Sequence, residues 1–304
     1  MERLAIFVLV LLSVSVFSAA LVCAGSNGAY DVEITPKISI KGPKGGGKPV
    51  APVATGVLGD PPPDPEDRWA VIIGISDYAG EANDIHYSDD DALDMLNALI
   101  NVYGYRRDHI LLLISDYKVN NATRNDIIEA IDWLREHETE GDEVVFFYSG
   151  HGARGRANDG DGETIDEGIV PWEATASSVI WDGDLKQMFS NFDTTRIIFI
   201  FDSCYSGGMT DLKAGGRIIV MASTETGLAY EDSNLENGVF TYYFIHEGVV
   251  RGMADVYDHN GNKALYEPQD VTIEEAFDYA KAIVRAIAPQ TPTIVDTFEN
   301  DLLP

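Results

Sequence analysis

Two residues that could act together in catalysis each follow a buried apolar run. His151 lies in FYSGHGARG, directly after the run EVVFFY, and Cys204 lies in FDSCYSGG, directly after RIIFIF. A thiolate is a strong nucleophile, and a nearby histidine can take the thiol proton and later pass it to a leaving amine. The sequence therefore predicts a catalytic pair of His151 and Cys204 for acyl-transfer chemistry.

Glycines beside these two residues fit the same chemistry. Gly150 and Gly152 let the backbone bend away from the strand and leave amide groups that can face a developing oxyanion. The pattern GHGARG also resembles a dinucleotide-binding loop, but the following residues, RANDGDGETIDEG, do not form a helix that could hold a pyrophosphate. The sequence has no G-x-S-x-G motif, which argues against a serine hydrolase.

The elements that must position this pair alternate along the chain from Arg68 onward. Apolar runs typical of buried strands occupy residues 69–75, 109–114, 143–148, 196–201 and 217–222. Stretches with helical spacing occupy residues 89–104, 122–138, 184–192, 240–250 and 272–288. This order predicts an α/β fold with a mostly parallel central sheet of about six strands and helices on both faces. Since ligands collect at the carboxyl ends of parallel strands, His151 and Cys204 should meet at one rim.

The N-terminal residues predict export. Residues 1–24 hold one nearly unbroken apolar run, which fits either a cleaved signal peptide or an uncleaved membrane anchor. Residues 25–67 are rich in Gly, Pro and Lys and predict a tether or a pro-region, and residues 68–304 form the globular domain. We therefore expect a protein that is secreted or anchored to the outer face of the cell membrane, with Cys204 as the only thiol of the mature domain.

The charge of the chain restricts its partners. The formal net charge of the 304 residues is -29 at pH 7. Such a surface repels nucleic acid and anionic membranes, and it favours cations and basic peptides. An acidic coat that only keeps the protein soluble is the alternative explanation.

Several motifs together resemble a known family. The segments SGHG and DSCYSGG, each after an apolar strand, resemble the caspase-like cysteine peptidases, and most closely the metacaspases and their prokaryotic relatives. The resemblance covers Arg68 to about Pro292 and includes WAVIIGISDY, YSDDDALDM and NGVFTYYF. It implies a caspase-like fold and a cysteine endopeptidase that hydrolyses polypeptides after Arg or Lys.

The resemblance also implies roles for individual residues. His151 would be the general base, Cys204 the nucleophile, and the amides of Gly152 and Cys204 the oxyanion hole. The pocket for the residue before the scissile bond would be lined by Asp91, Ser149 and Asp202. Two carboxylates in one pocket repel each other unless a cation lies between them, which favours Arg or Lys over Asp. Metacaspases commonly have His directly after the nucleophile, whereas this chain has Tyr205.

A dense group of acidic residues raises the question of a metal. The chemistry requires no cofactor, but the acidic loop resembles the calcium site of metacaspases that depend on this ion, and calcium would then be an activator. A solvated acidic loop without a metal is the alternative. The candidate ligands are Asp159, Asp161, Glu163, Asp166, Glu167 and Asp211.

Three other functions stay open at this point. A legumain-like or gingipain-like peptidase would share the catalytic pair but differ in the residue it recognises. A caspase-fold binding module would have lost catalysis, and a secreted calcium-binding surface protein would use only the acidity. For a peptidase, we expect self-cleavage after Lys213 or Arg217, or in the N-terminal segment near Lys44 or Lys48.

Overall fold

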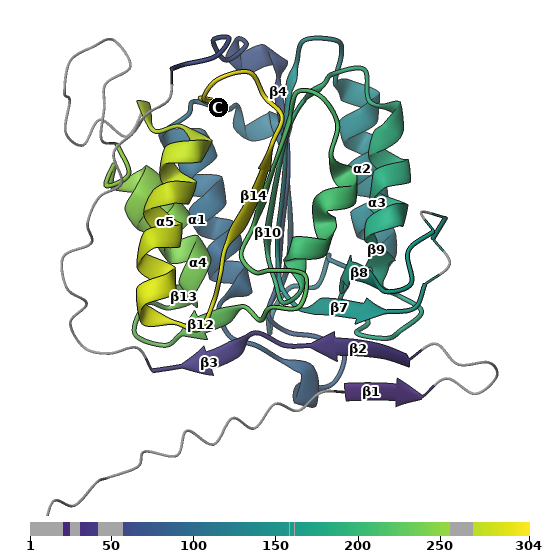
Figure 1. Ribbon diagram of the computed structural model, residues 1–304. Helices are drawn as coiled ribbons and strands as arrows, with labels where there is room; N and C mark the ends of the chain where they lie inside the picture. Colours follow the sequence, from purple (N-terminus) through teal and green to yellow (C-terminus); the bar gives the residue numbers. More distant parts are fainter. Residues whose placement is uncertain (1–20, 25–30, 42–56, 158, 161, 256–269) are drawn as a thin grey trace, which may run out of the picture.

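The centre of the protein is a six-stranded sheet with the order β14-β11-β10-β6-β4-β5 (Figure 1). The structure is a computed structural model that describes residues 21–24, 31–41, 57–157, 159–160, 162–255 and 270–304. The parallel strands are β4 (Arg68–Ile75), β5 (Ile110–Ser115), β6 (Glu143–Ser149), β10 (Arg196–Asp202) and β11 (Arg217–Met221), and β14 (Thr293–Asp296) pairs antiparallel with β11. The predicted α/β fold and the mostly parallel sheet are confirmed.

Helices cover both faces of this sheet, as predicted (Figure 1). One face packs against α1 (Ser88–Asn101) and α5 (Ile273–Ile287), and the other against α2 (Arg124–His137) and α3 (Asp182–Met188). Alternate residues of β6 enter the two cores: Phe147 packs on the α1 side and Phe146 on the α2 side. Because every residue of β6 and β10 is buried, the residues between the strand ends are apolar on both faces of the sheet rather than alternating.

Two smaller sheets lie beside the carboxyl ends of the central strands (Figure 1). One contains β1 (Leu21–Ala24), β2 (Asp31–Thr35), β7 (Gly152–Gly155), β8 (Asp166–Ile169) and β9 (Ile180–Trp181). The other contains β13 (Asn237–Gly238), β12 (Tyr230–Asp232) and β3 (Ile38–Ile40). After β13 the chain forms α4 (Val239–Thr241), which continues as a π-helix over Tyr242–Val250.

The N-terminal segment contributes strands to both small sheets. Residues 1–20 of the expected export signal lie outside the described residues, as do Lys44, Lys48 and Asp161. Within the segment expected as a tether or pro-region, residues 31–35 pair with β7 and residues 38–40 pair with β12. A free tether therefore does not describe residues 31–41, which are folded onto the domain.

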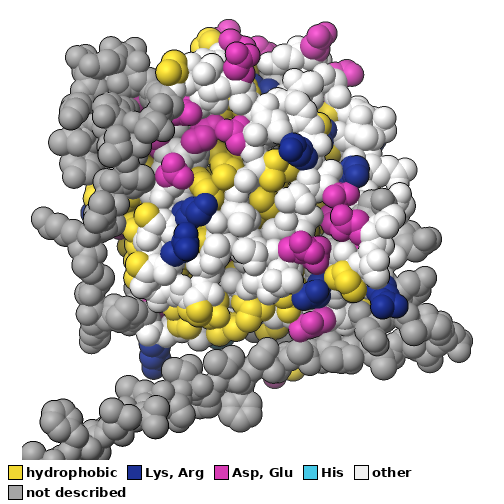
Figure 2. All heavy atoms as spheres, in the orientation of Figure 1, with side chains coloured by type: hydrophobic (Ala, Val, Ile, Leu, Met, Phe, Trp, Pro, Cys, Tyr) yellow, Lys and Arg dark blue, Asp and Glu magenta, His cyan; other side chains and the backbone are white. Residues whose placement is uncertain are grey.

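Among the helices of the described ranges, none combines the length and the apolar character that crossing a bilayer requires. On the face shown in Figure 2, acidic side chains occur in separate groups with basic side chains between them.

Candidate active site

Strand register brings the two predicted catalytic residues to one rim. Strands β6 and β10 are neighbours, and their last residues, Ser149 and Asp202, are direct partners. His151 and Cys204 each follow two residues later, and the Gly150 amide donates to the carbonyl of Asp202 at 3.3 Å. A Cβ added at Gly152 would lie 1.8 Å from the carbonyl oxygen of Cys204, so the two loops touch where Gly152 has no side chain.

The ring of His151 is fixed from two sides. It stacks on Tyr78 with ring centroids 4.0 Å apart, and the Tyr78 hydroxyl accepts the His151 amide at 2.7 Å. The His151 Nε2 atom lies 2.6 Å from the carbonyl oxygen of Asn83. A carbonyl can only accept, so Nε2 carries the proton and Nδ1 holds the lone pair in the neutral ring. This tautomer makes Nδ1 the atom that can act as a base.

The thiol of Cys204 is buried against backbone groups. Sγ donates to the carbonyl oxygen of Pro36 at 3.4 Å and accepts the amide of Ala229 at 3.3 Å. The chain turns sharply after Cys204, because the next residue, Tyr205, has a left-handed φ of 61°. The Tyr205 hydroxyl lies 3.1 Å from Thr35 Oγ1, and the guanidinium of Arg154 lies 5.4 Å from the centre of the Tyr205 ring. The sequence offered no role for Arg154 beyond the loop.

Burial keeps both groups of the pair neutral in this structure. His151 and Cys204 are each 1% exposed. Burial lowers the pKa of His151 to about 4, opposed by the carbonyl of Asn83 and assisted by the charge of Lys37. Burial raises the pKa of Cys204 to about 12, although the Ala229 backbone contact and Lys37 act the other way. For catalysis, water or substrate must replace the groups that bury His151 and Cys204 in this structure.

The three predicted pocket residues come together beside the pair. The Ser149 hydroxyl donates to Asp91 Oδ2 at 2.7 Å, and the side chains of Asp91 and Asp202 are 0% exposed. Asp91 Oδ1 accepts the amide of Gly238 at 2.8 Å, and Asp202 Oδ2 accepts the Thr241 hydroxyl at 2.7 Å. These contacts direct Asp91 Oδ2 and Asp202 Oδ1 toward one point between them.

A lysine that the sequence analysis did not single out occupies that point. Lys37 Nζ lies 2.9 Å from Asp91 Oδ2, 3.2 Å from Asp202 Oδ1 and 2.7 Å from Ser149 Oγ. Burial alone lowers the pKa of Lys37, but Asp202 and Asp91 together outweigh that effect and hold the pKa above its ordinary value. The pocket therefore contains a charged ammonium group. The alternation of apolar and polar residues in VEIT and ISI was the signal that could have placed this segment in a sheet.

Acidic side chains of the predicted metal loop lie close to the first residue of α3. Ligand oxygens within 4.8 Å of one another occur in two groups, Asp159 with Asp166 and Asp182, and Glu163 with Glu167 and Asp182. Both oxygens of Glu167 are buried without a hydrogen bond, and burial, assisted by Glu225, raises its pKa to about 8. Carboxylate oxygens in this number suit a hard cation such as calcium. Asp182, the first residue of α3, was not among the predicted ligands.

Asp211 stands apart from these two groups. Its carboxylate pairs with Lys186 at 2.9 Å on the surface. In this structure Lys186 neutralises Asp211, and the expectation that Asp211 joins the metal ligands stays a prediction.

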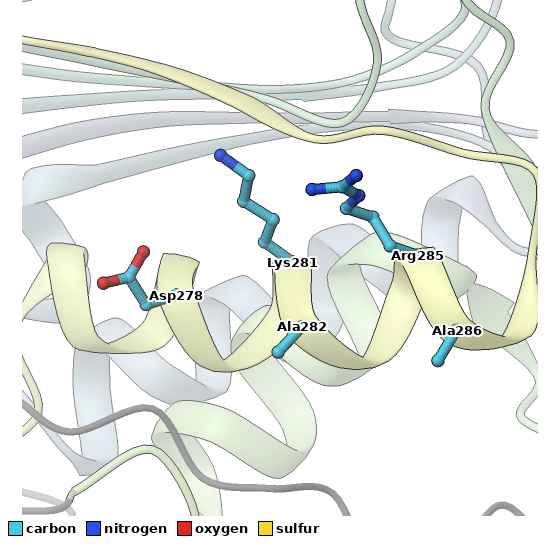
Figure 3. Close-up of a pocket in the computed structure, with 5 residues that line it drawn as sticks. All are labelled: Asp278, Lys281, Ala282, Arg285 and Ala286. Carbon is cyan, nitrogen blue, oxygen red and sulfur yellow. The ribbon is translucent and has the colours of Figure 1, made fainter.

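One further hollow lies away from the site. Asp278, Lys281, Ala282, Arg285 and Ala286 line it along one side of α5, and their side chains do not converge on a common point (Figure 3). None of the predicted site residues lines this hollow.

Comparisons with known proteins agree with this geometry. Residues 68–213 match the family model described as metacaspase, peptidase C14 domain. Metacaspase-1 of Pyricularia oryzae is 35% identical over 150 residues, which cover 48% of this chain and 38% of that protein. Metacaspase-1 of Saccharomyces cerevisiae is also 35% identical over 150 residues, or 34% of its length. The match thus spans well under half of these curated relatives.

A solved structure supports the fold alone. The crystal structure of protein GSU0716 from Geobacter sulfurreducens superposes with a TM-score of 0.51 at 19% identity, over 75% of this chain and 92% of that one. The sequence matches, in turn, confirm the predicted resemblance to caspase-like cysteine peptidases and, among them, to metacaspases.

Proposed function

From the match of residues 68–213 to the metacaspase peptidase C14 domain, we propose that this chain is a cysteine endopeptidase that cuts polypeptides after Lys or Arg. One observation carries the residue preference: a lysine ammonium lies within 3.2 Å of both Asp91 and Asp202 in a fully buried pocket. An aspartate substrate would add a third carboxylate to this pocket, at a high desolvation and repulsion cost.

The catalytic steps follow from the tautomer of His151. Nδ1 takes the proton of the Cys204 thiol, and the thiolate attacks the carbonyl carbon of the substrate. The amides of Gly152 and Cys204 would stabilise the negative oxygen of the tetrahedral intermediate. When the intermediate collapses, the protonated ring gives its proton to the leaving amine. Water, deprotonated by the same ring, then hydrolyses the thioester and frees the acid.

Calcium is proposed as an activator rather than a participant in bond cleavage. Its ligands would come from Asp159, Asp166 and Asp182, together with Glu163 and Glu167, whose oxygens lie near one another. A bound cation would offset the mutual repulsion of these carboxylates and so order the loop between β7 and β8.

Location and partners complete the proposal. The apolar run of residues 1–24 supports export, either as a secreted protein or as one anchored outside the membrane. The strongly acidic chain supports basic polypeptides as substrates and argues against nucleic acid.

A peptide panel tests the function. Fluorogenic peptides that end in Lys, Arg, Asn or Asp are incubated with the protein and with Cys204→Ala, with and without calcium. We expect cleavage after Lys and Arg only, and none by the variant. Cleavage restricted to Asn or Asp would refute the pocket assignment, and equal cleavage by Cys204→Ala would refute the nucleophile.

A further inference from the structure

The N-terminal segment runs through the candidate active site as an added strand. Residues Asp31–Thr35 pair antiparallel with β7, directly after His151, and Ile38–Ile40 pair parallel with β12. Between the two strands, Pro36 and Lys37 cross the cleft next to Cys204. Figure 1 shows β2 and β3 as one purple path beneath the carboxyl ends of the central strands. Extended peptides bind proteins in this way through backbone pairing, with pockets for single side chains.

Lys37 anchors this segment in the pocket. Its side chain is 0% exposed, and it contacts Asp91, Asp202 and Ser149 at once. The pocket wall fits closely, since a Cβ added at Gly238 would lie 2.8 Å from Lys37 Nζ. In contrast, Lys41 at the end of the same segment is exposed. The segment thus uses one particular lysine to neutralise two carboxylates that would otherwise be buried together.

The same segment covers the thiol. Sγ of Cys204 donates to the carbonyl oxygen of Pro36, and Thr35 lies against the hydroxyl of Tyr205 beside it. With 1% of each residue exposed, neither Cys204 nor His151 is accessible to a polypeptide from solution. Residues 31–40 must leave before any substrate can enter, so the wild type cleaves peptides only in the small fraction of molecules in which this segment has detached.

The register of the segment places the carbonyl of Pro36 at the thiol. Sγ of Cys204 donates to that carbonyl oxygen at 3.4 Å, whereas attack on the bond after Lys37 requires a thiolate. The amide of Ile38, which is the leaving group of that bond, donates to the carbonyl of Ala229 at 3.0 Å. The bound segment therefore holds the sulfur as a neutral thiol and holds the leaving amide in place.

We propose that residues Asp31–Ile40 are an intramolecular inhibitor of the cleft, anchored by Lys37 in the pocket and bound in a register that protects the segment from cleavage. This inference rests on the proposed peptidase function, because it assigns the regulation of that same site. It also names the class of ligand that the cleft holds: an extended peptide with one buried lysine, paired with the edge of β12. Activation is then the release of this segment. A cut after Arg217 is not needed for it, and that residue lies at the start of a central strand, with its side chain bound to the carbonyls of Leu212 and Phe189.

The test compares Lys37→Met with Lys41→Met in the full chain. Methionine keeps most of the length of the side chain but leaves Asp91 and Asp202 without their cation, so the segment should detach. Two readouts are taken: the rate at which iodoacetamide alkylates Cys204, followed by peptide mass spectrometry, and the hydrolysis of Lys and Arg peptides. We expect both to rise about a hundred-fold in Lys37→Met, since loss of a buried ion-pair partner changes equilibria by at least this factor. Both should be unchanged in Lys41→Met, and Lys37→Arg should stay closed.

Two further measurements keep the test decisive. If Lys37→Met does not fold, Thr35→Asp replaces it, because this variant buries a carboxylate beside Tyr205 and Glu33 and leaves the pocket intact. A synthetic peptide of residues 31–41 should inhibit the opened variant and be recovered uncut, while the same peptide with norleucine at position 37 should not inhibit. A peptide that is cut after Lys37 would overturn the protective register.

The outcomes separate this inference from the proposed function. Faster alkylation without hydrolysis by any variant would support the inhibitor and refute the peptidase. Equal alkylation and equal hydrolysis in the wild type, Lys37→Met and Thr35→Asp would overturn the inhibitor while the peptidase stands.

Discussion

The pocket carboxylate Asp91 offers a quantitative test of the buried charge arrangement. In the structure it accepts hydrogen bonds from Lys37, Ser149 and Gly238, and its side chain is 0% exposed. The substitution Asp91→Asn keeps the shape of the side chain but removes one of the two carboxylates that contact Lys37. The buried ammonium group then keeps Asp202 and the hydroxyl of Ser149 as partners.

The expected magnitude follows from the burial of the pair. Breaking a buried ion pair by removing one partner costs about 3–5 kcal/mol. Since Asp202 still compensates Lys37 at 3.2 Å, we expect the lower end, about 3 kcal/mol of unfolding free energy. In the double variant with Lys37→Met most of this cost should disappear, so that the double-mutant cycle gives a coupling of about 2–3 kcal/mol.

Urea denaturation measures these values in the Cys204→Ala background, where self-cleavage cannot interfere. The exposed Asp64 supplies the matched control, because Asp64→Asn should change the unfolding free energy by less than about 0.5 kcal/mol. If Asp91→Asn costs no more than Asp64→Asn, or if the cycle shows no coupling, Lys37 does not occupy the pocket and the assignment of the pocket fails with it.

Three further predictions concern the histidine, the glycine and the acidic loop. Because burial lowers the pKa of His151 to about 4, the folded state excludes a proton that the unfolded chain binds, so stability is full above about pH 6.5 and falls as the pH drops toward 4. Between pH 7 and pH 4, the wild type should lose roughly 3 kcal/mol more unfolding free energy than His151→Asn, as measured by urea denaturation. Equal losses in the two proteins would contradict the neutral buried ring. Gly152→Ala places a Cβ 1.8 Å from the carbonyl oxygen of Cys204, so it should lower the unfolding free energy by about 1–3 kcal/mol and abolish hydrolysis. Gly215→Ala, whose Cβ meets nothing within 4 Å, should change neither stability nor hydrolysis. A fully active Gly152→Ala enzyme would refute the contact between the two loops. Calcium at a hundred-fold excess over its Kd should stabilise the wild type by about 3 kcal/mol and should stabilise Asp182→Asn far less, whereas the control Asp184→Asn should respond like the wild type. A wild-type melting temperature that does not change with calcium would exclude the metal site.

The sequence was sufficient for the parts of the fold that local pattern determines. Continuous apolar runs identified the central strands, and helical spacing identified α1, α2 and α5, because burial on both sheet faces imposes those patterns. The approach of Ser149 to Asp202 and of His151 to Cys204 followed from the rule that carboxyl ends of parallel strands share one rim.

The sequence did not reveal those parts of the fold and of the site that depend on contacts between residues far apart in the chain. The strands at residues 31–40 are short and acquire their strand character by pairing with β7 and β12, and they lie beside Gly-rich and Pro-rich sequence that indicates a tether. For the same reason Lys37 carried no signal of its role. Asp182 is explained locally as an acidic residue at a helix N-terminus, and only the packing of α3 against β8 brings it to Glu167. The pairing of Asp211 with Lys186 was likewise not apparent, because the two residues are distant in sequence.

The central claim is that Cys204 is a nucleophile served by a pocket for basic side chains. It is tested most directly by mass spectrometry of the Lys37→Met protein after incubation with a peptidyl-lysine acyloxymethyl ketone or with its peptidyl-aspartate counterpart. We expect one adduct, on Cys204, with the lysine probe only, and no adduct after His151→Ala. Labelling of another residue, or equal labelling of Cys204 by the aspartate probe, would contradict it.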